Sequence, residues 1–343
     1  MNDKRAVTGN SIQASAFGIV LGVYGLGRGW TAATGVWRVP PAIGSAILVG
    51  ADCVWLVLLI LYVVKWVRSR ACAWEELRHP IKSCYVDLVF SSTLLVSMSA
   101  LEFSRNVAVT LAVAGWTGHC VFTVWRAGNL WRGTRPQDEN TAVLFLPQIT
   151  GNFISALAAG TFGYPGLAAL FFGAGALSWV PVEALILGRL YSQGLPPSLR
   201  PTLGIRLSPP ATACVAYLTL HDGTPDFLVQ CLLGYGFLQA AILLRLSGWI
   251  RAQDFVPTYW GFSFGIVALG WSALSVARLG LHGIIEFLAL PLFVIENLTI
   301  GAFLVLTMKL IGSGNWFTPQ ARFSREMRAD RENSERDHET SEI

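Results

Sequence analysis

Long apolar stretches alternate with short charged clusters along almost the whole chain. Each stretch has about 20 residues, the length of helix that crosses roughly 30 Å of hydrocarbon. The pattern predicts an all-α polytopic membrane protein with ten transmembrane helices. We expect these helices at residues 12–33, 42–64, 84–101, 107–125, 144–161, 167–187, 203–220, 227–246, 257–277 and 284–306.

The basic residues divide unequally between the two sets of loops. Of the 25 Lys and Arg residues, 21 lie in the termini and the even-numbered loops, which leaves only Arg28, Arg38, Arg105 and Arg278 for the opposite side. The positive-inside rule therefore predicts that both termini are cytoplasmic and that the number of crossings is even. We expect a cytoplasmic N-terminus at 1–11, a transmembrane domain at 12–310 and a disordered cytoplasmic tail at 311–343.

Composition agrees with a membrane protein, since 53% of the residues are hydrophobic and only 13% are charged. The net charge of +4 comes from basic residues at the ends of apolar stretches, so no nucleic-acid partner is expected. The six cysteines form no CxxC pair, and the histidines show no HExxH spacing. We expect no metal site, no cofactor and no enzyme activity.

No clear A-x-A cleavage site follows the first apolar stretch, so that helix should be retained.

The odd-numbered helices are more polar than the even-numbered ones. Gly, Pro, Ser, Thr, Asn and Gln make up 35 of 97 residues in the odd helices and 20 of 106 in the even helices. Polar and helix-weakening residues are tolerated at membrane depth where they face protein or water. We therefore expect the odd helices to form an inner ring and the even helices to form a shell that faces lipid.

Prolines mark the starts of four odd helices, at Pro80, Pro147, Pro209 and Pro257. The spacing of about 50 to 70 residues indicates a repeated helical hairpin, and five hairpins around a central pore is the simplest arrangement. Pro209 and its neighbour Pro210 are expected to lie inside a turn of helix seven and to kink it.

The expected orientation gives the inner ring an electrostatic preference. Every odd helix would begin at the cytoplasmic side, and helix N-termini carry a partial positive charge. Such a mouth favours anions. The inner ring has almost no charged residue within it, which suits weak and fast passage rather than tight capture.

Several motifs, in order, are similar to those of a known family. They are FGIVLG at 17–22, RHP at 78–80, LWRG at 130–133, NFISA at 152–156, FGAGALSW at 172–179, GYGFLQ at 234–239, FSFG at 262–265 and PLF at 291–293. Through these motifs the chain resembles, over nearly its whole length, the tellurite-resistance/dicarboxylate transporter family, which includes the plant guard-cell slow anion channel. The resemblance implies ten helices as five hairpins around a pore, a homotrimer in the bacterial inner membrane and small inorganic anions as the transported species.

The resemblance also implies a gate. In that family a phenylalanine on helix nine blocks the pore, and the motif assigns this role to Phe264. Gly18 and Gly22 on helix one would leave room for the ring to move. Further residues expected beside the gate or the pore are Asn152, Phe153, Pro209 and Gly265.

Two questions stay open at the level of sequence. From composition alone, Phe264 is a packing residue, and the Gly-x-x-x-Gly pairs that start at Gly18 and Gly261 are close-packing helix faces. The resemblance implies a channel, but a carrier that exports tellurite, sulfite or a C4-dicarboxylate is the alternative. A carrier needs a midplane substrate site, and no arginine lies in the middle of an odd helix.

Four acidic residues lie in or near apolar stretches, where an unpaired charge is costly. They are Asp52, Glu183, Glu286 and Glu296. Each is either paired with a neighbouring helix or part of a proton or cation path. Asn152 and Asn297 present the same alternatives, and Asn152 is the better pore candidate because it lies on an odd helix.

Overall fold

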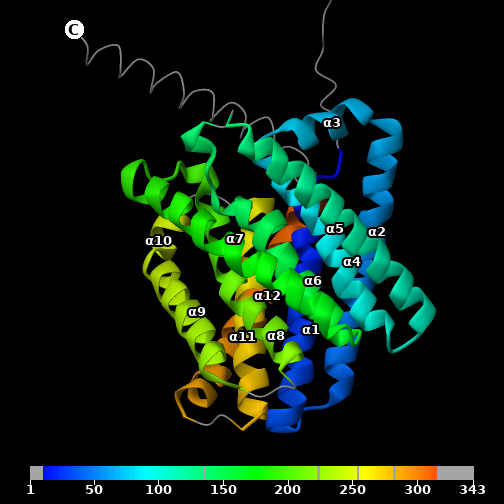
Figure 1. Cartoon of the computed structure of the whole chain (residues 1–343), viewed down its shortest axis with the longest axis vertical. Helices are drawn as coiled ribbons and strands as arrows, with labels where there is room; N and C mark the ends of the chain where they lie inside the picture. The colour runs from blue at the N-terminus through cyan, green and yellow to red at the C-terminus, as the bar shows by residue number, and fades with distance from the viewer. Residues whose placement is uncertain (1–10, 134–135, 222–224, 253–254, 281–282, 315–343) are drawn as a thin grey trace, which may run out of the picture.

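The computed structural model describes residues 11–133, 136–221, 225–252, 255–280 and 283–314, and every regular element in these ranges is helical. The expected segment 1–11 therefore lies outside the described residues except for Ser11, as does the expected tail beyond residue 314. Figure 1 shows a bundle of helices that run mostly along its long axis, with the short helix α3 (Arg70–Arg78) at one end.

Within the described residues, the long helices pair as five hairpins, each of which joins a more buried helix to a more exposed one. Neighbours in the sequence pack against each other as α1 with α2, α4 with α5, α6 with α7, α8 with α9, and α11 with α12. The first members are α1 (Gly18–Trp37), α4 (Asp87–Ala100), α6 (Gly151–Thr161), α8 (Ser208–Leu220) and α11 (Gly261–Arg278). The second members are α2 (Pro41–Arg68), α5 (Arg105–Trp131), α7 (Pro165–Ser192), α9 (Phe227–Arg245) and α12 (Ile284–Gly312).

Burial separates the two sets of helices. In the spans that contain α4, α6 and α11, between 83 and 94% of the residues in the apolar stretch are buried. In α2, α5, α7, α9 and α12 the corresponding share is only 11 to 28%. The prediction that the more polar odd helices are the inner set is therefore confirmed for these spans, and the apolar shell is the surface that lipid would contact.

Eight of the described helical segments are long and apolar enough to cross a membrane. They include all five outer helices and the segments that contain α4, α6 and α11. The other two expected spans contain α1, whose glycines and Arg28 lower its hydropathy, and α8, which continues a 3-10 segment at Pro197–Leu207 whose prolines and arginines lower the hydropathy of the whole segment. The chain is an all-α polytopic membrane protein, and the count of ten stays a prediction.

A 3-10 or π-helical segment directly precedes every inner helix, and the hydrophobic pattern does not indicate these segments. The 3-10 segments η1 (Ala14–Phe17), η2 (Lys82–Val86), η6 (Pro197–Leu207) and η7 (Pro257–Trp260) run directly into α1, α4, α8 and α11. A π-helical segment, η5 (Leu146–Thr150), does so before α6, after the short 3-10 turn η4 (Ala142–Leu144). Pro209 and Pro210 stand in the first turn of α8, where the 3-10 geometry of η6 ends.

Four outer helices, α2, α5, α7 and α12, are longer than the apolar stretches that predict them, because the helix continues into more polar residues, whereas α9 has nearly its expected length. Helix α2 ends at Arg68 and α12 at Gly312, and both were expected to end several residues earlier. Two short helices, α3 and α10 (Ser247–Ile250), and the 3-10 turn η3 (Gln137–Glu139) lie in the connecting segments. Within the described ranges, these three were not expected.

Asp226 is the N-cap residue of α9 and lies outside the apolar stretch. Its carboxylate accepts hydrogen bonds from the Tyr217 hydroxyl at 2.6 Å and from the Val229 N–H at 3.1 Å. These donors stabilise the ionised form, so the pKa of Asp226 is lowered, chiefly by the bond from Tyr217. The charged carboxylate also suits the positive end of the helix.

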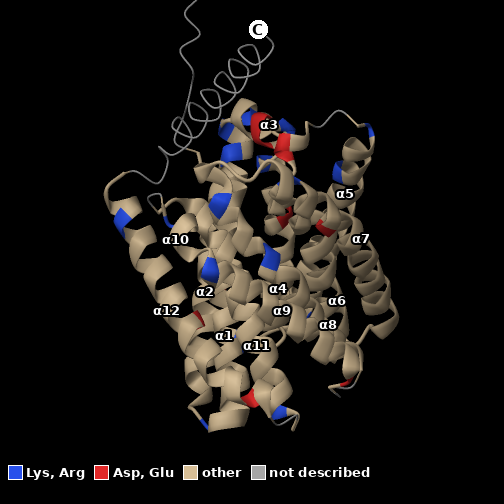
Figure 2. Cartoon of the chain, turned by 90° about the vertical axis from the view of Figure 1, so that its left-hand side faces the viewer, with Lys and Arg blue, Asp and Glu red and all other residues tan. Residues whose placement is uncertain are grey.

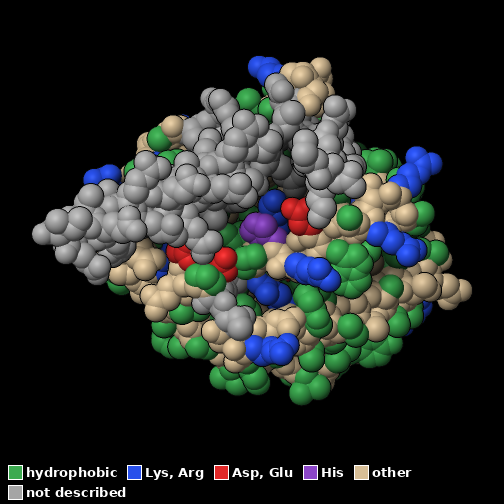
Figure 3. Space-filling model, turned by 90° about the horizontal axis from the view of Figure 1, so that it is seen from above, with side chains coloured by type: hydrophobic (Ala, Val, Ile, Leu, Met, Phe, Trp, Pro, Cys, Tyr) green, Lys and Arg blue, Asp and Glu red, His purple; other side chains and the backbone are tan. Residues whose placement is uncertain are grey.

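Charge is concentrated at one end of the bundle. Figure 2 shows most Lys and Arg residues near the end where α3 lies, above a long section with few charged residues. Viewed onto that end, Figure 3 shows Lys and Arg at several places, with Asp and Glu closer to the middle of the face.

Candidate functional site

A small cavity lies where the beginnings of the five inner helices meet. Its volume is about 20 Å³, roughly that of a single water molecule and too little for a hydrated anion. Every inner segment contributes to its wall. The lining residues are Ser15, Gly18 and Leu21; Tyr85 and Leu88; Leu146; Ile205 and Ser208; and Pro257, Thr258, Trp260, Gly261 and Phe264.

The lining of this cavity is uncharged but offers hydroxyl donors. Among the described residues, the hydroxyls of Tyr85 and Thr258 have no hydrogen-bond partner. The Ser208 hydroxyl donates to Thr150 at 3.3 Å. Unpaired O–H groups of this kind are available to donate hydrogen bonds to an anion.

Phe264 is part of the cavity wall and is only 4% exposed. It lies in the first turn of α11, directly after η7. Its ring edge also faces Gly25 of α1, since a Cβ atom added to that glycine would lie 3.8 Å from the Phe264 Cδ2. Phe264 therefore lies in the cavity wall, on α11 and beside α1.

Gly18 and Gly22 bring α1 close to α11. A Cβ atom on Gly18 would lie 3.3 Å from the Trp260 Cβ, and one on Gly22 would lie 2.6 Å from the Ser263 Cβ. The Ser263 hydroxyl also donates to the Gly18 carbonyl at 3.2 Å. Gly18 both packs against α11 and lines the cavity, whereas Gly22 packs against α11 without being part of the cavity lining.

Gly265 faces a different neighbour of α11. A Cβ atom there would lie 2.5 Å from the Leu207 Cβ and 3.0 Å from the Gly204 carbonyl oxygen, both in η6. Helix α11 therefore has close glycine contacts with α1 on one side and with η6 on another. Any shift of α11 must change one of these two contacts.

The remaining expected residues lie around the cavity without being part of its lining. The Phe153 side chain is fully buried and packs on the rings of Phe172 and Trp179 in α7, with centroids at 5.3 and 6.2 Å. The Asn152 amide nitrogen donates to the Gln148 carbonyl at 2.7 Å, and its oxygen lies 3.4 Å from the His119 Nε2. Pro209 follows the cavity residue Ser208.

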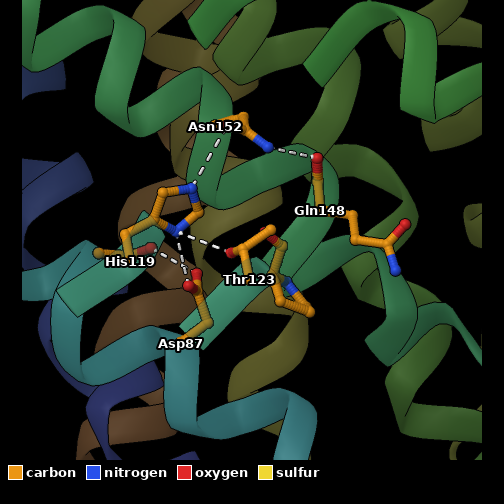
Figure 4. Close-up of polar contacts among 7 residues, drawn as sticks. Asp87, His119, Thr123, Gln148 and Asn152 are labelled. Carbon is orange, nitrogen blue, oxygen red and sulfur yellow. Dashed lines mark hydrogen bonds and ion pairs between the residues drawn. The ribbon is translucent and has the colours of Figure 1, made fainter. Parts of the chain in front are cut away.

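A buried Asp–His pair links three helices, and sequence reasoning did not find it. His119 of α5 lies 2.7 Å from Asp87 of α4 through its Nδ1, and the two side chains are 1% and 0% exposed. Figure 4 shows this pair with Thr123 and with Asn152 of α6. A Cβ atom on Gly151 would collide with the carboxylate of Asp87 and with the imidazole ring of His119. The glycine thereby permits the pair to sit against α6.

Glu183 of α7 and Arg206 of η6 form a further ion pair, in which Arg206 is buried and Glu183 is partly buried. The Glu183 carboxylate also accepts from the Tyr235 hydroxyl at 2.7 Å and the Trp179 indole N–H at 3.2 Å, and Arg206 donates to Gln239 at 3.2 Å. Arg206 therefore points to the outer helices, and the described cavity lining has no charged residue.

The acidic residues in the apolar stretches do not share one environment. Asp52 accepts a hydrogen bond from Ser99 at 2.8 Å, so structural pairing is confirmed for Asp52 as well as for Glu183. Glu286 is exposed at the start of α12. Glu296 is completely buried, and among the described residues neither of its oxygens has a hydrogen-bond partner.

Residues 11–308 match the family described as SLAC1, voltage-dependent anion channel. The chain belongs to the voltage-dependent anion channel family. It is 30% identical over 303 residues to the tellurite resistance protein TehA homolog of Haemophilus influenzae, covering 88% of this chain and 91% of that protein. It is 21% identical over 284 residues to the guard cell S-type anion channel SLAC1 of Arabidopsis thaliana, covering 76% of this chain and 49% of the plant protein.

Membership of the voltage-dependent anion channel family confirms the resemblance drawn from the motifs. The family is one of membrane anion transport rather than of enzymes, and the long apolar helices make this member a multi-pass membrane protein. In this SLAC1 family member, the candidate functional site is the uncharged cavity among the inner helices.

Proposed function

We propose that this protein is an anion channel whose pathway runs between the five inner helices and is closed by Phe264. The observation that carries the proposal is the cavity of about 20 Å³ to which all five inner segments contribute and in whose wall Phe264 lies. A pathway that narrows to the space of one water molecule does not pass a hydrated anion. The side chain at the narrowest region is therefore the one to remove.

The surroundings of the cavity favour negative ions. The beginnings of all five inner helices meet there, and the aligned peptide dipoles of an α-helix place partial positive charge at its N-terminal end. The hydroxyls of Tyr85 and Thr258 add donors, and no charged lining residue would hold an anion tightly. Weak binding of this kind is compatible with rapid conduction.

Replacing Phe264 by Ala tests the gate. The smaller side chain should enlarge the narrow point, and a barrier lowered by about 1.4 kcal/mol raises the anion current about tenfold. Currents are recorded from purified protein in planar bilayers, and reversal potentials under ion substitution separate anions from cations. A Phe264→Ala current equal to that of the parent would refute the gate.

Phe262→Ala is the matched control. Phe262 lies on the same helix two residues earlier, faces Gly204 and is not part of the cavity lining. Its truncation removes the same volume from another face of α11, so it should leave the current at the parental level. An equal increase in both variants would point to general loosening of α11 instead of a gate.

A carrier mechanism is the second candidate because the relative from Haemophilus influenzae is named for tellurite resistance. A carrier that exports tellurite, sulfite or a C4-dicarboxylate would show saturable flux and counterflow, in which an unlabelled anion on one side speeds the exit of a labelled one. A channel shows no counterflow. Flux from vesicles loaded with each anion discriminates between the two mechanisms.

The proposal includes the organisation of the whole chain. The channel has ten spans in a transmembrane domain at 12–310, flanked by cytoplasmic termini at 1–11 and 311–343, and lies in the bacterial inner membrane as a homotrimer. The concentration of Lys and Arg at the α3 end supports this orientation. Small inorganic anions are the proposed substrates.

A further inference from the structure

Glu296 extends from the outer helix α12 into the contact between two inner helices. Its side chain has no solvent exposure. The Oε1 atom lies 2.5 Å from the place that a Cβ on Gly29 of α1 would take, and Oε2 lies still closer to the corresponding place on Gly270 of α11. The carboxyl group thus occupies space that exists only because both residues are glycines.

The carboxyl group has no partner in this position. Neither oxygen accepts or donates a hydrogen bond within the described part of the chain, although the neighbouring Asn297 is bonded to Trp30 at 2.9 Å. Titratable and charged groups do occur on the elements packed against α12 and on α12 itself. They are Tyr24 and Arg28 on α1, Arg278 on α11, Tyr259 on η7, and Glu286 and Lys309 on α12.

None of these groups neutralises Glu296 in the described structure. The Arg28 guanidinium lies over the Trp271 ring, 5.4 Å from its centroid, and the Arg278 side chain lies against Gly35. No ion pair or hydrogen bond among the described residues joins Glu296 to either arginine. An ionised carboxylate that is buried without a partner costs several kcal/mol, whereas the neutral acid costs far less. The packed arrangement therefore accommodates the protonated form.

We propose that Glu296 binds a proton inside the membrane-spanning bundle and that loss of this proton loosens the packing of α1 against α11. The coupling to conduction rests on the proposed function. Gly270 lies six residues after Phe264 on α11, or about 9 Å along the helix. An ionised carboxylate between α1 and α11 requires water or a counter-charge, and admitting either one separates the two helices on which Phe264 and its neighbour Gly25 lie.

The sign of the pH effect follows from this packing. The packed state holds the proton and the loosened state releases it, so rising pH favours the loosened state. Anion flux should therefore increase with pH. The protonated acid keeps the pathway closed at low pH.

The proton site is tested without measuring transport. A protonated carboxyl in an apolar site adds through its oxygen to the central carbon of N,N′-dicyclohexylcarbodiimide, its proton passes to a carbodiimide nitrogen, and rearrangement gives a stable N-acylurea of unchanged total composition. Purified protein in lipid vesicles is treated at about pH 6 and about pH 9, and the adducts are located by mass spectrometry. We expect Glu296 to be modified at the lower pH and at least about fivefold less at the higher pH.

The exposed Glu286 on the same helix is the internal control, because an apolar reagent should modify it far less. Absence of the adduct from Glu296 at both pH values, or equal modification at both, would overturn the proton site. The measurement uses the unaltered protein, so it does not depend on whether a variant folds.

Flux tests the coupling. Efflux of chloride from vesicles is compared at about pH 6 and about pH 9 for the parent, Glu296→Gln and Glu286→Gln. Glutamine keeps the shape of the side chain but cannot ionise. We expect flux through the parent and Glu286→Gln to rise about threefold or more with pH, and flux through Glu296→Gln to stay constant.

The outcomes separate the two levels of the proposal. A parent flux that does not rise with pH, or a Glu296→Gln flux that rises as the parent does, refutes the coupling even when Glu296 is labelled. Failure of Phe264→Ala to raise the current refutes the gate and leaves the labelling result standing.

Discussion

Two pairs of ionisable side chains join residues from helical segments that are distant in sequence. Glu183 and Arg206 are 23 residues apart, and Asp87 and His119 are 32 residues apart. Each pair joins an inner segment to an outer helix. A periodic pattern along one helix does not show which residue on another helix will face it, so these pairs were outside the reach of sequence reasoning.

Removing one member of the Glu183–Arg206 pair should destabilise the fold. In Arg206→Met the largely buried Glu183 carboxylate would lose its cation, at a cost of about 3 kcal/mol. We expect a lower unfolding temperature for the detergent-solubilised protein, measured by the loss of the monodisperse chromatographic peak after heating. The double variant Glu183→Met with Arg206→Met should recover part of the loss. If the single variant is as stable as the parent, the pair does not hold η6 to α7.

At the scale of elements, glycines decide how closely the inner helices approach. Gly25 of α1 has Val267 of α11 directly in front of it, so there is no room for a Cβ atom. Gly50 of the outer helix α2 has no neighbouring atom within 4 Å of that position. The two glycines lie in helix interiors and differ chiefly in this contact.

Alanine substitutions at these positions should therefore have opposite effects. Gly25→Ala should destabilise the protein by about 1 to 3 kcal/mol because α1 and α11 must move apart. Gly50→Ala should be neutral or stabilising by up to about 1 kcal/mol, as alanine favours the helix. Thermal unfolding of both variants under the same conditions measures the difference. Equal unfolding temperatures would show that α1 and α11 can move apart without a loss of stability.

Sequence predicted the elements better than their beginnings. Apolar length and the excess of polar residues in odd helices identified the inner and outer sets, since both follow from what each helix face contacts. The 3-10 and π segments before the inner helices depend on how these segments pack around the cavity. The residue types of η6, for example, do not indicate a 3-10 rather than an α-helical geometry. Helix α3 was missed because its nine residues include charged ones and it is too short to span a membrane.

The candidate site was predicted only in outline. The motif around Phe264 indicated the residue, and the structure places it with Gly18 in one cavity wall. The unpaired hydroxyls of Tyr85 and Thr258 and the unpartnered carboxyl of Glu296 were not distinguished by sequence. Whether a polar atom has a partner depends on three-dimensional neighbours, not on residue type.

At the scale of the whole molecule, the distribution of charge predicts how the protein is inserted. The end of the bundle that contains α3 has far more Lys and Arg than the opposite end. The loops at the opposite end lie near only Arg38, Arg105 and Arg278 among the described Lys and Arg residues. A green fluorescent protein fused to the C-terminus should therefore fluoresce in intact bacteria, because it folds to its fluorescent form in the cytoplasm. Alkaline phosphatase at the same position should be inactive. An active phosphatase fusion with a dark fluorescent fusion would reverse the orientation.

The outer helices also differ in length around the bundle. Helices α2, α5, α7 and α12 have 27 to 29 residues, or about 40 to 44 Å, whereas α9 has 19, or about 28 Å. A bilayer around such a belt meets a shorter wall at α9 than elsewhere. Lipids there match an ordinary hydrocarbon thickness, while those at the long helices must thicken or the helices must tilt. The protein would thus impose an uneven membrane thickness on its own surroundings and respond unequally when the bilayer itself becomes thicker or thinner.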